Sequence, residues 1–88
     1  SRPGYKYMVV LQDSDSQRTI HFGATGYNDY TTHPAKVREA RKQAYLLRHK
    51  VTEDWKDPLT AGFWSRWILW NKPSVTASLK DVKSRFNL

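Results

Sequence analysis

The chain has 88 residues, of which 39% are hydrophobic and 26% are charged, and it carries a formal net charge of +7 with no cysteine. This length allows one small domain, and the absence of cysteine excludes disulfides and thiolate metal sites. No apolar run approaches the roughly 20 residues of a membrane-spanning helix and no signal peptide is visible, so we expect a protein that is not secreted.

The positive charge is unevenly distributed. Residues 1–30 contain three basic and three acidic side chains, whereas residues 31–88 contain twelve basic and five acidic ones. The whole excess therefore lies in the second part, which we expect to be helical. Localised positive charge favours a polyanionic partner, such as nucleic acid, an acidic protein surface or an anionic membrane. The alternative is a basic surface that serves solubility.

The N-terminal part predicts a β-hairpin over about residues 5–22. Its first run is rich in aromatic and β-branched residues, a turn cluster follows at 13–16, and Ile20 and Phe22 then share one face of an alternating run. Two strands alone are marginally stable in water, so we expect helices to cover one face.

The connection after the hairpin groups Tyr27, Asp29, Tyr30 and His33 in one loop. Such a group could supply a general base and an orienting carboxylate. The alternative is Asx-turn hydrogen bonding by Asn28 and Asp29, with both tyrosines packed on the hairpin. We favour this alternative and predict no catalytic residues, because so short a domain has little room for a substrate cleft.

A helix is predicted over about 34–50, because Pro34 suits a first helical position and apolar residues recur at helical spacing. We expect one stripe to face the core: Val37, Ala40, Ala44, Leu47 and Val51. A second stripe carries cations that neutralise phosphates and a tyrosine that could stack on a base. The candidate nucleic-acid-binding residues on and beside it are Arg38, Arg41, Lys42, Tyr45, Arg48, His49 and Lys50.

Three of the four tryptophans lie between residues 64 and 70, in a predicted helix over about 61–70 that Thr60 can cap. On an α-helix Phe63, Trp67 and Trp70 share one face, which we expect to enter the core. Trp64, Arg66 and Leu69 then lie nearer the surface and are the candidate protein-interface residues. The alternative, which we favour for the run as a whole, is that all of it is internal.

A last helix is predicted over about 75–86, capped by Ser74. Its apolar stripe is Val75, Leu79, Val82 and Phe86. The expected core combines Trp67, Trp70, Leu79, Val82 and Phe86 with the Val37, Ala44 and Leu47 stripe. The predicted fold class is α+β, an N-terminal β-hairpin packed against two or three helices in a single domain of residues 1–88.

The chain offers no metal-binding pattern. His21, His33 and His49 are twelve and sixteen residues apart, without the close spacing that zinc sites show. We therefore predict neither a metal site nor a cofactor.

Several motifs resemble a family of small basic proteins from large nucleocytoplasmic double-stranded DNA viruses. They are GYNDYT at 26–31, DPLTAGFWSRW at 57–67 and WNKP at 70–73, and the resemblance extends over about residues 20–88. It implies a viral setting, either in the virion or in the nucleus or cytoplasm of an infected cell. It implies no activity, because the family has none assigned.

These observations predict a small basic viral protein that binds nucleic acid, DNA in the first place, without sequence specificity through its basic helix. The alternative is a minor structural or cement protein of a virus particle, which contacts capsid components or an acidic protein surface through its tryptophan-rich segment. A membrane partner is disfavoured, because the basic and aromatic residues lie on different segments.

Overall fold

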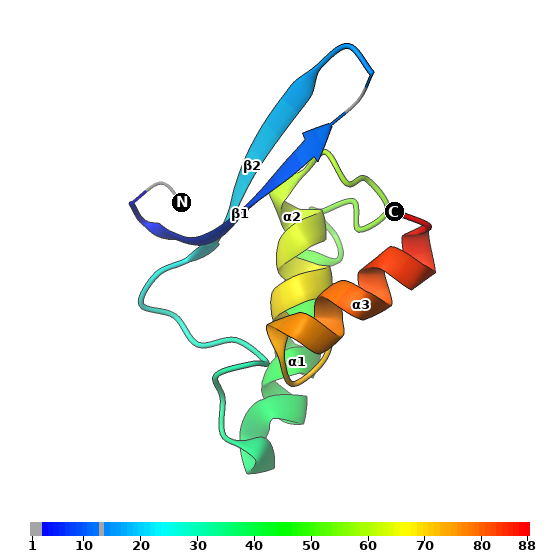
Figure 1. Ribbon diagram of the computed structural model, residues 1–88. Coiled ribbons are helices and arrows are strands. Elements are labelled where there is room, and N and C mark those ends of the chain that lie inside the picture. The colour runs from blue at the N-terminus through cyan, green and yellow to red at the C-terminus, as the bar shows by residue number, and fades with distance from the viewer. Residues whose placement is uncertain (1–2, 13) are drawn as a thin grey trace.

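The computed structural model describes residues 3–12 and 14–88, and it begins with a two-stranded antiparallel sheet. Strand β1 (Tyr5–Gln12) pairs with strand β2 (Gln17–Ala24). The hairpin projects away from the helices, which gather on the other side of the molecule (Figure 1). One face of the hairpin is nevertheless covered, because Val9, Leu11, Ile20 and Phe22 pack in or against the core.

In the described part of the chain the helical segments are α1 (Ala35–His49), α2 (Ala61–Trp64), the π-helix η1 (Ser65–Leu69) and α3 (Val75–Phe86). The predicted N-caps are confirmed. Thr60 Oγ1 accepts a hydrogen bond from the Phe63 amide at 3.3 Å, and Ser74 Oγ accepts one from the Ala77 amide at 3.1 Å. A hairpin followed by helices in one small domain confirms the predicted α+β class.

The segment predicted as one helix over 61–70 changes from α-helix to π-helix at Ser65. Phe63 and Ile68, and likewise Trp64 and Leu69, lie five residues apart, and all four are at most 4% exposed. Residues five apart point about 140° away from each other on an α-helix. A π-helix closes its hydrogen bonds between residues five apart, so the wider turn brings both pairs to the core.

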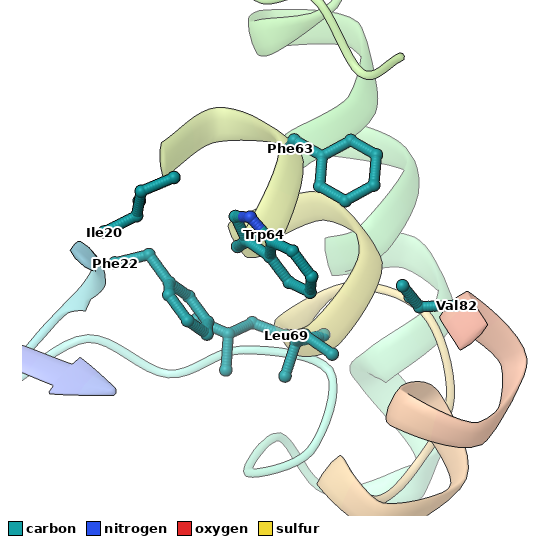
Figure 2. Packing of buried hydrophobic residues seen from close by; sticks show 7 residues of the cluster. Ile20, Phe22, Phe63, Trp64, Leu69 and Val82 are labelled. Carbon is teal, nitrogen blue, oxygen red and sulfur yellow. The ribbon is translucent and has the colours of Figure 1, made fainter. Parts of the chain in front are cut away.

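The core forms where β2 meets α2, η1 and α3 (Figure 2). Its buried members are Ile20, Phe22, Phe63, Trp64, Ile68, Leu69 and Val82, with Val9, Leu11, Trp67, Trp70, Val75 and Phe86 partly buried against them. Tyr7 of β1 lies opposite Phe22 in the sheet register and stacks on its ring at 6.0 Å. The hairpin is thus held by alternate residues of both strands.

The expected core contribution of α1 is wrong. Leu47 is 65% exposed and Val51 is 77% exposed, and Tyr45 is the buried residue of this helix. An aromatic ring buries more area than the small aliphatic side chains of the predicted stripe and can stack on the tryptophans. The helix therefore turns its Tyr45 side inward. Leu79 of α3, also assigned to the core, is 40% exposed.

Candidate functional site

Tyr45 attaches α1 to the rest of the protein through stacked rings. Its ring lies 4.6 Å from Trp70 at an interplanar angle of 11° and 6.4 Å from Trp55 at 14°. The His49 ring stacks on it at 4.4 Å. Burial raises the pKa of the Tyr45 hydroxyl well above its usual range. At 5% exposure, Tyr45 is an anchor of the fold, and its predicted stacking on a base is wrong.

Arg38 and Lys42 lie on the same inward side of α1 and pack over Tyr30. The Arg38 guanidinium is 5.6 Å from the Tyr30 ring centre and the Lys42 Nζ is 4.9 Å from it. Lys42 Nζ also donates a hydrogen bond to the Asn71 carbonyl at 3.2 Å. Burial lowers the pKa of the Lys42 ammonium. These two cations join α1 to the loops beside it and are only partly exposed.

His49 is the fourth inward residue of α1. Its Nδ1 lies 2.7 Å from a carboxylate oxygen of Glu53, and the other oxygen of Glu53 accepts a hydrogen bond from the Trp55 indole at 3.1 Å. The pair fixes the orientation of the imidazole and closes the C-terminal end of α1.

The predicted binding stripe therefore divides into two groups. Arg38, Lys42, Tyr45 and His49 face the protein, whereas Arg41, Arg48 and Lys50 are exposed. Lys36 is exposed as well, although the prediction omitted it. Among the described residues, none of the exposed four has a carboxylate within ion-pair distance. We call Lys36, Arg41, Arg48 and Lys50 the outer cations. Their free charge is the main electrostatic feature of α1.

The predicted protein-interface residues do not form a surface. Trp64 and Leu69 are each 3% exposed, so their assignment to an interface is wrong. Trp64, at the end of α2, lies in the core with Phe63, and the wider turn of the π-helix brings Leu69 to the same cluster. The Trp64 indole donates a hydrogen bond to the Pro58 carbonyl at 2.7 Å. Arg66 is partly buried, and burial lowers the pKa of its guanidinium.

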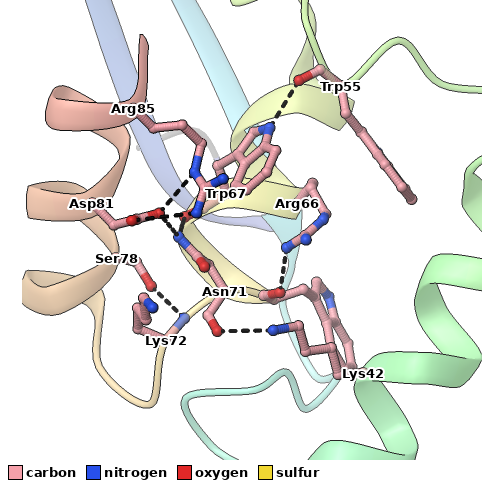
Figure 3. A network of polar contacts seen from close by, with 10 residues as sticks. Lys42, Trp55, Arg66, Trp67, Asn71, Lys72, Ser78, Asp81 and Arg85 are labelled. Atoms are coloured by element: carbon pink, nitrogen blue, oxygen red, sulfur yellow. Dashed lines mark hydrogen bonds and ion pairs between the residues drawn. The ribbon is translucent and has the colours of Figure 1, made fainter. Parts of the chain in front are cut away.

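Arg66 belongs to a polar network that joins η1 and the residues after it to α1 and α3 (Figure 3). It donates to the Trp70 carbonyl at 2.7 Å, and its guanidinium lies 4.2 Å from the Trp67 ring centre. Asn71 donates to the Trp67 carbonyl at 3.1 Å and to Asp81 at 2.7 Å. The network uses these polar groups to hold the tryptophan segment together.

A cavity of about 470 Å³ opens beside the C-terminal half of α1. Its walls come from the hairpin base and the loop after it, from α1, and from the α2–η1 segment. The polar lining residues are Lys6, Tyr27, Asn28, Asp29, Tyr45, Arg48, His49, Glu53 and Ser65. The 27–33 loop and α1 are separate in the sequence pattern and meet only in the folded chain. Their convergence depends on the inward turn of α1, which no local pattern signals.

Asp29 organises one wall of this cavity. It is 2% exposed, and its carboxylate accepts hydrogen bonds from the Thr31 amide at 2.8 Å and from Lys6 Nζ at 2.7 Å. The Asx-turn interpretation of Asp29 is confirmed. The expected packing of Tyr27 on the hairpin is wrong, because its ring is 74% exposed at the cavity.

The described residues include no group of three or more histidine, aspartate and glutamate side chains placed to hold a metal ion. Over the same residues, each helix is too short or too polar to cross a bilayer.

Comparison with known proteins gives one match. Residues 1–49, which carry the hairpin, the 27–33 loop and all of α1, match a family of unknown function, DUF5754. No curated protein and no solved structure is significantly similar to the chain. Because the match covers more than half of the 88 residues, the chain belongs to the DUF5754 family.

Proposed function

We propose that this protein binds nucleic acid, DNA in the first place, through the outer cations of α1. The observation that carries the proposal is that all four are exposed and lack an ion-pair partner among the described residues. A viral genome as the natural polyanion is suggested by the resemblance of the sequence alone and is part of the proposal.

The position of α1 supports this assignment. The N-terminal end of the helix extends beyond the other elements, so a long polyanion can approach this half, which carries Lys36 and Arg41, without meeting the hairpin (Figure 1). With 15 residues the helix is about 22 Å long. Lysine and arginine side chains that neutralise phosphates release condensed counterions, and this source of affinity is independent of base sequence.

The salt dependence of binding tests the proposal. Each phosphate contact on duplex DNA contributes about −0.9 to the slope of log affinity against log salt. Four contacts therefore predict a loss of about 150-fold between about 50 and 200 mM salt, measured by fluorescence anisotropy on a labelled duplex. Arg41→Glu with Arg48→Glu removes two contacts and should reduce this loss to about 12-fold.

A variant of equal charge on another helix controls for net charge. Lys80→Glu with Lys83→Glu changes two exposed cations of α3. The salt dependence of its binding should be the same as that of the wild type. Equal weakening by the α1 and α3 variants would refute a site on α1. Absence of duplex binding at the lower salt would refute the function and direct attention to an acidic protein partner.

The burial of the tryptophan segment disfavours the alternative function, a particle component that docks through this segment. Trp64 and Leu69 are buried in the protein's own core, and the indole groups of Trp64 and Trp67 already donate hydrogen bonds to its backbone. No observation on this segment favours a partner surface.

A further inference from the structure

We infer that the cavity beside α1 holds one unstacked nucleotide of a single-stranded segment. The inference rests on the proposed function and specifies the form of nucleic acid that it involves. It is carried by the presence of an exposed tyrosine and an exposed arginine in the lining of one cavity of about 470 Å³. This volume lies within the range of small-ligand pockets, roughly 300–1,000 Å³.

Tyr27 supplies the aromatic surface. Tyr27 is 74% exposed, and the described residues make no ring contact with it. The other tyrosine of the cavity, Tyr45, has its faces covered by Trp70 and His49. Single-strand-binding proteins combine a cationic groove with aromatic side chains on which bases stack. Tyr27 is therefore the residue of this cavity that can receive a base.

Arg48 supplies the cation at the rim and connects the cavity to the outer cations. It lines the cavity, and Arg41 lies seven residues earlier on the same side of α1, about 10 Å away along the helix axis. A strand whose base enters the cavity can thus place its phosphates along Arg48 and Arg41.

Of the two carboxylates of the cavity, Asp29 is neutralised by its ion pair with Lys6, whereas Glu53 keeps its negative charge, so the uncharged base belongs in the cavity and the phosphate at Arg48 on the rim. Asp29 accepts hydrogen bonds from Lys6 and Thr31, and Glu53 accepts them from His49 and Trp55. Donors remain on the same walls. Lys6 Nζ carries three protons, of which Asp29 Oδ2 and the Tyr27 carbonyl accept two.

These features favour a single strand over a duplex. In a duplex the bases are stacked on one another and only their edges are accessible in the grooves. The face of an exposed tyrosine offers nothing to such an edge, whereas it stacks on an unpaired base of any sequence. The outer cations can contact the phosphates of a single strand and of a duplex alike. The difference in affinity between the two therefore depends on stacking by Tyr27.

The test compares a labelled 15-nucleotide thymidine strand with a duplex of the same length, on the full chain and at the same salt. Tyr27→Leu should weaken single-strand binding by about 5- to 140-fold, the range for removing one base–aromatic stack, and leave duplex binding unchanged. Tyr27→Trp keeps a stacking face and should retain single-strand affinity. Circular dichroism checks that the variants fold.

The outcomes distinguish this inference from the proposed function. If the wild type binds neither nucleic acid, the function fails and the inference with it. If both bind with a steep salt dependence but Tyr27→Leu binds the strand as tightly as the wild type, the inference alone is overturned. If an equal concentration of thymidine monophosphate displaces the strand, the ligand of the cavity is a free nucleotide, and the inference of a single-stranded ligand is refuted.

Discussion

Truncation of Tyr45 to alanine should strongly destabilise the protein, because this side chain holds α1 in place. Removing a buried aromatic side chain costs about 3–5 kcal/mol. Tyr45 is 5% exposed and stacks closely on Trp70 and His49, so we expect about 4 kcal/mol. An 88-residue domain has a total stability of about 4–13 kcal/mol, so the loss is a third of it or more.

Urea denaturation followed by tryptophan fluorescence measures the loss, because Trp70 and Trp55 lie against the ring that is removed. Tyr45→Phe keeps the stacked ring and should cost less than about 1.5 kcal/mol, as a volume-conserving change. Hydrogen exchange should show the amides of α1 losing protection before those of α3. A loss below about 1 kcal/mol for Tyr45→Ala, or equal losses for both variants, would refute the anchoring role.

Two further predictions concern the hairpin end and the pH dependence of stability. Gly23 has a φ of +78°, and an added Cβ would lie 2.7 Å from Leu69 Cδ1, whereas Gly26 has a φ of +88° and open space around it. Gly26→Ala should therefore cost about 1–2 kcal/mol in urea denaturation from backbone strain alone, and Gly23→Ala should cost more; equal costs would argue against the contact with Leu69. Hydrogen bonds from Asn71 and Arg85 lower the pKa of Asp81. This carboxyl thus contributes stability above its unfolded pKa of about 3.9 and loses it as the pH falls through the folded value. The difference in melting temperature between the wild type and Asp81→Asn should shrink below about pH 4, and a constant difference would contradict the role of the charge.

The features that the sequence predicts correctly depend on local physical chemistry. Thr60 and Ser74 cap helices because a hydroxyl can accept from an amide three residues ahead in whatever fold surrounds it. The alternation of Ile20 and Phe22 places both in the core because strand side chains alternate between faces. Such signals need no knowledge of distant residues.

The orientation of α1 could not be predicted in the same way. Its aliphatic stripe and its Tyr45 stripe both have helical spacing, and the choice between them depends on partners far along the chain. Trp70 and Trp55 present rings on which Tyr45 stacks, and the Asn71 carbonyl receives the Lys42 ammonium. A tyrosine in the middle of a cationic stripe, in a chain with four tryptophans, is the signal that could have indicated the inward side.

The tryptophan run was assigned to the wrong faces for a different reason. The assignment assumed 3.6 residues per turn throughout, and the segment widens to a π-helix at Ser65. From that point each side chain is rotated relative to the α-helical expectation. Leu69 therefore joins Trp64 of α2 in the core, while Trp67 and Trp70 lie partly exposed at its edge.

The inward orientation of the Tyr45 side of α1 also determines where Arg48 lies, because the two residues are neighbours on one helix. Arg48 follows Tyr45 by three residues, close to one helical turn, and both line the cavity. Stacking of Tyr45 on Trp70 thus fixes the rotation that directs Arg48 to the rim and leaves Leu47 in solvent. With the aliphatic stripe inward instead, this arrangement would be lost. The exposure of Leu47 and Val51 is therefore the cost of a rotation that places Arg48 at the cavity, with Arg41 on the same side of the helix.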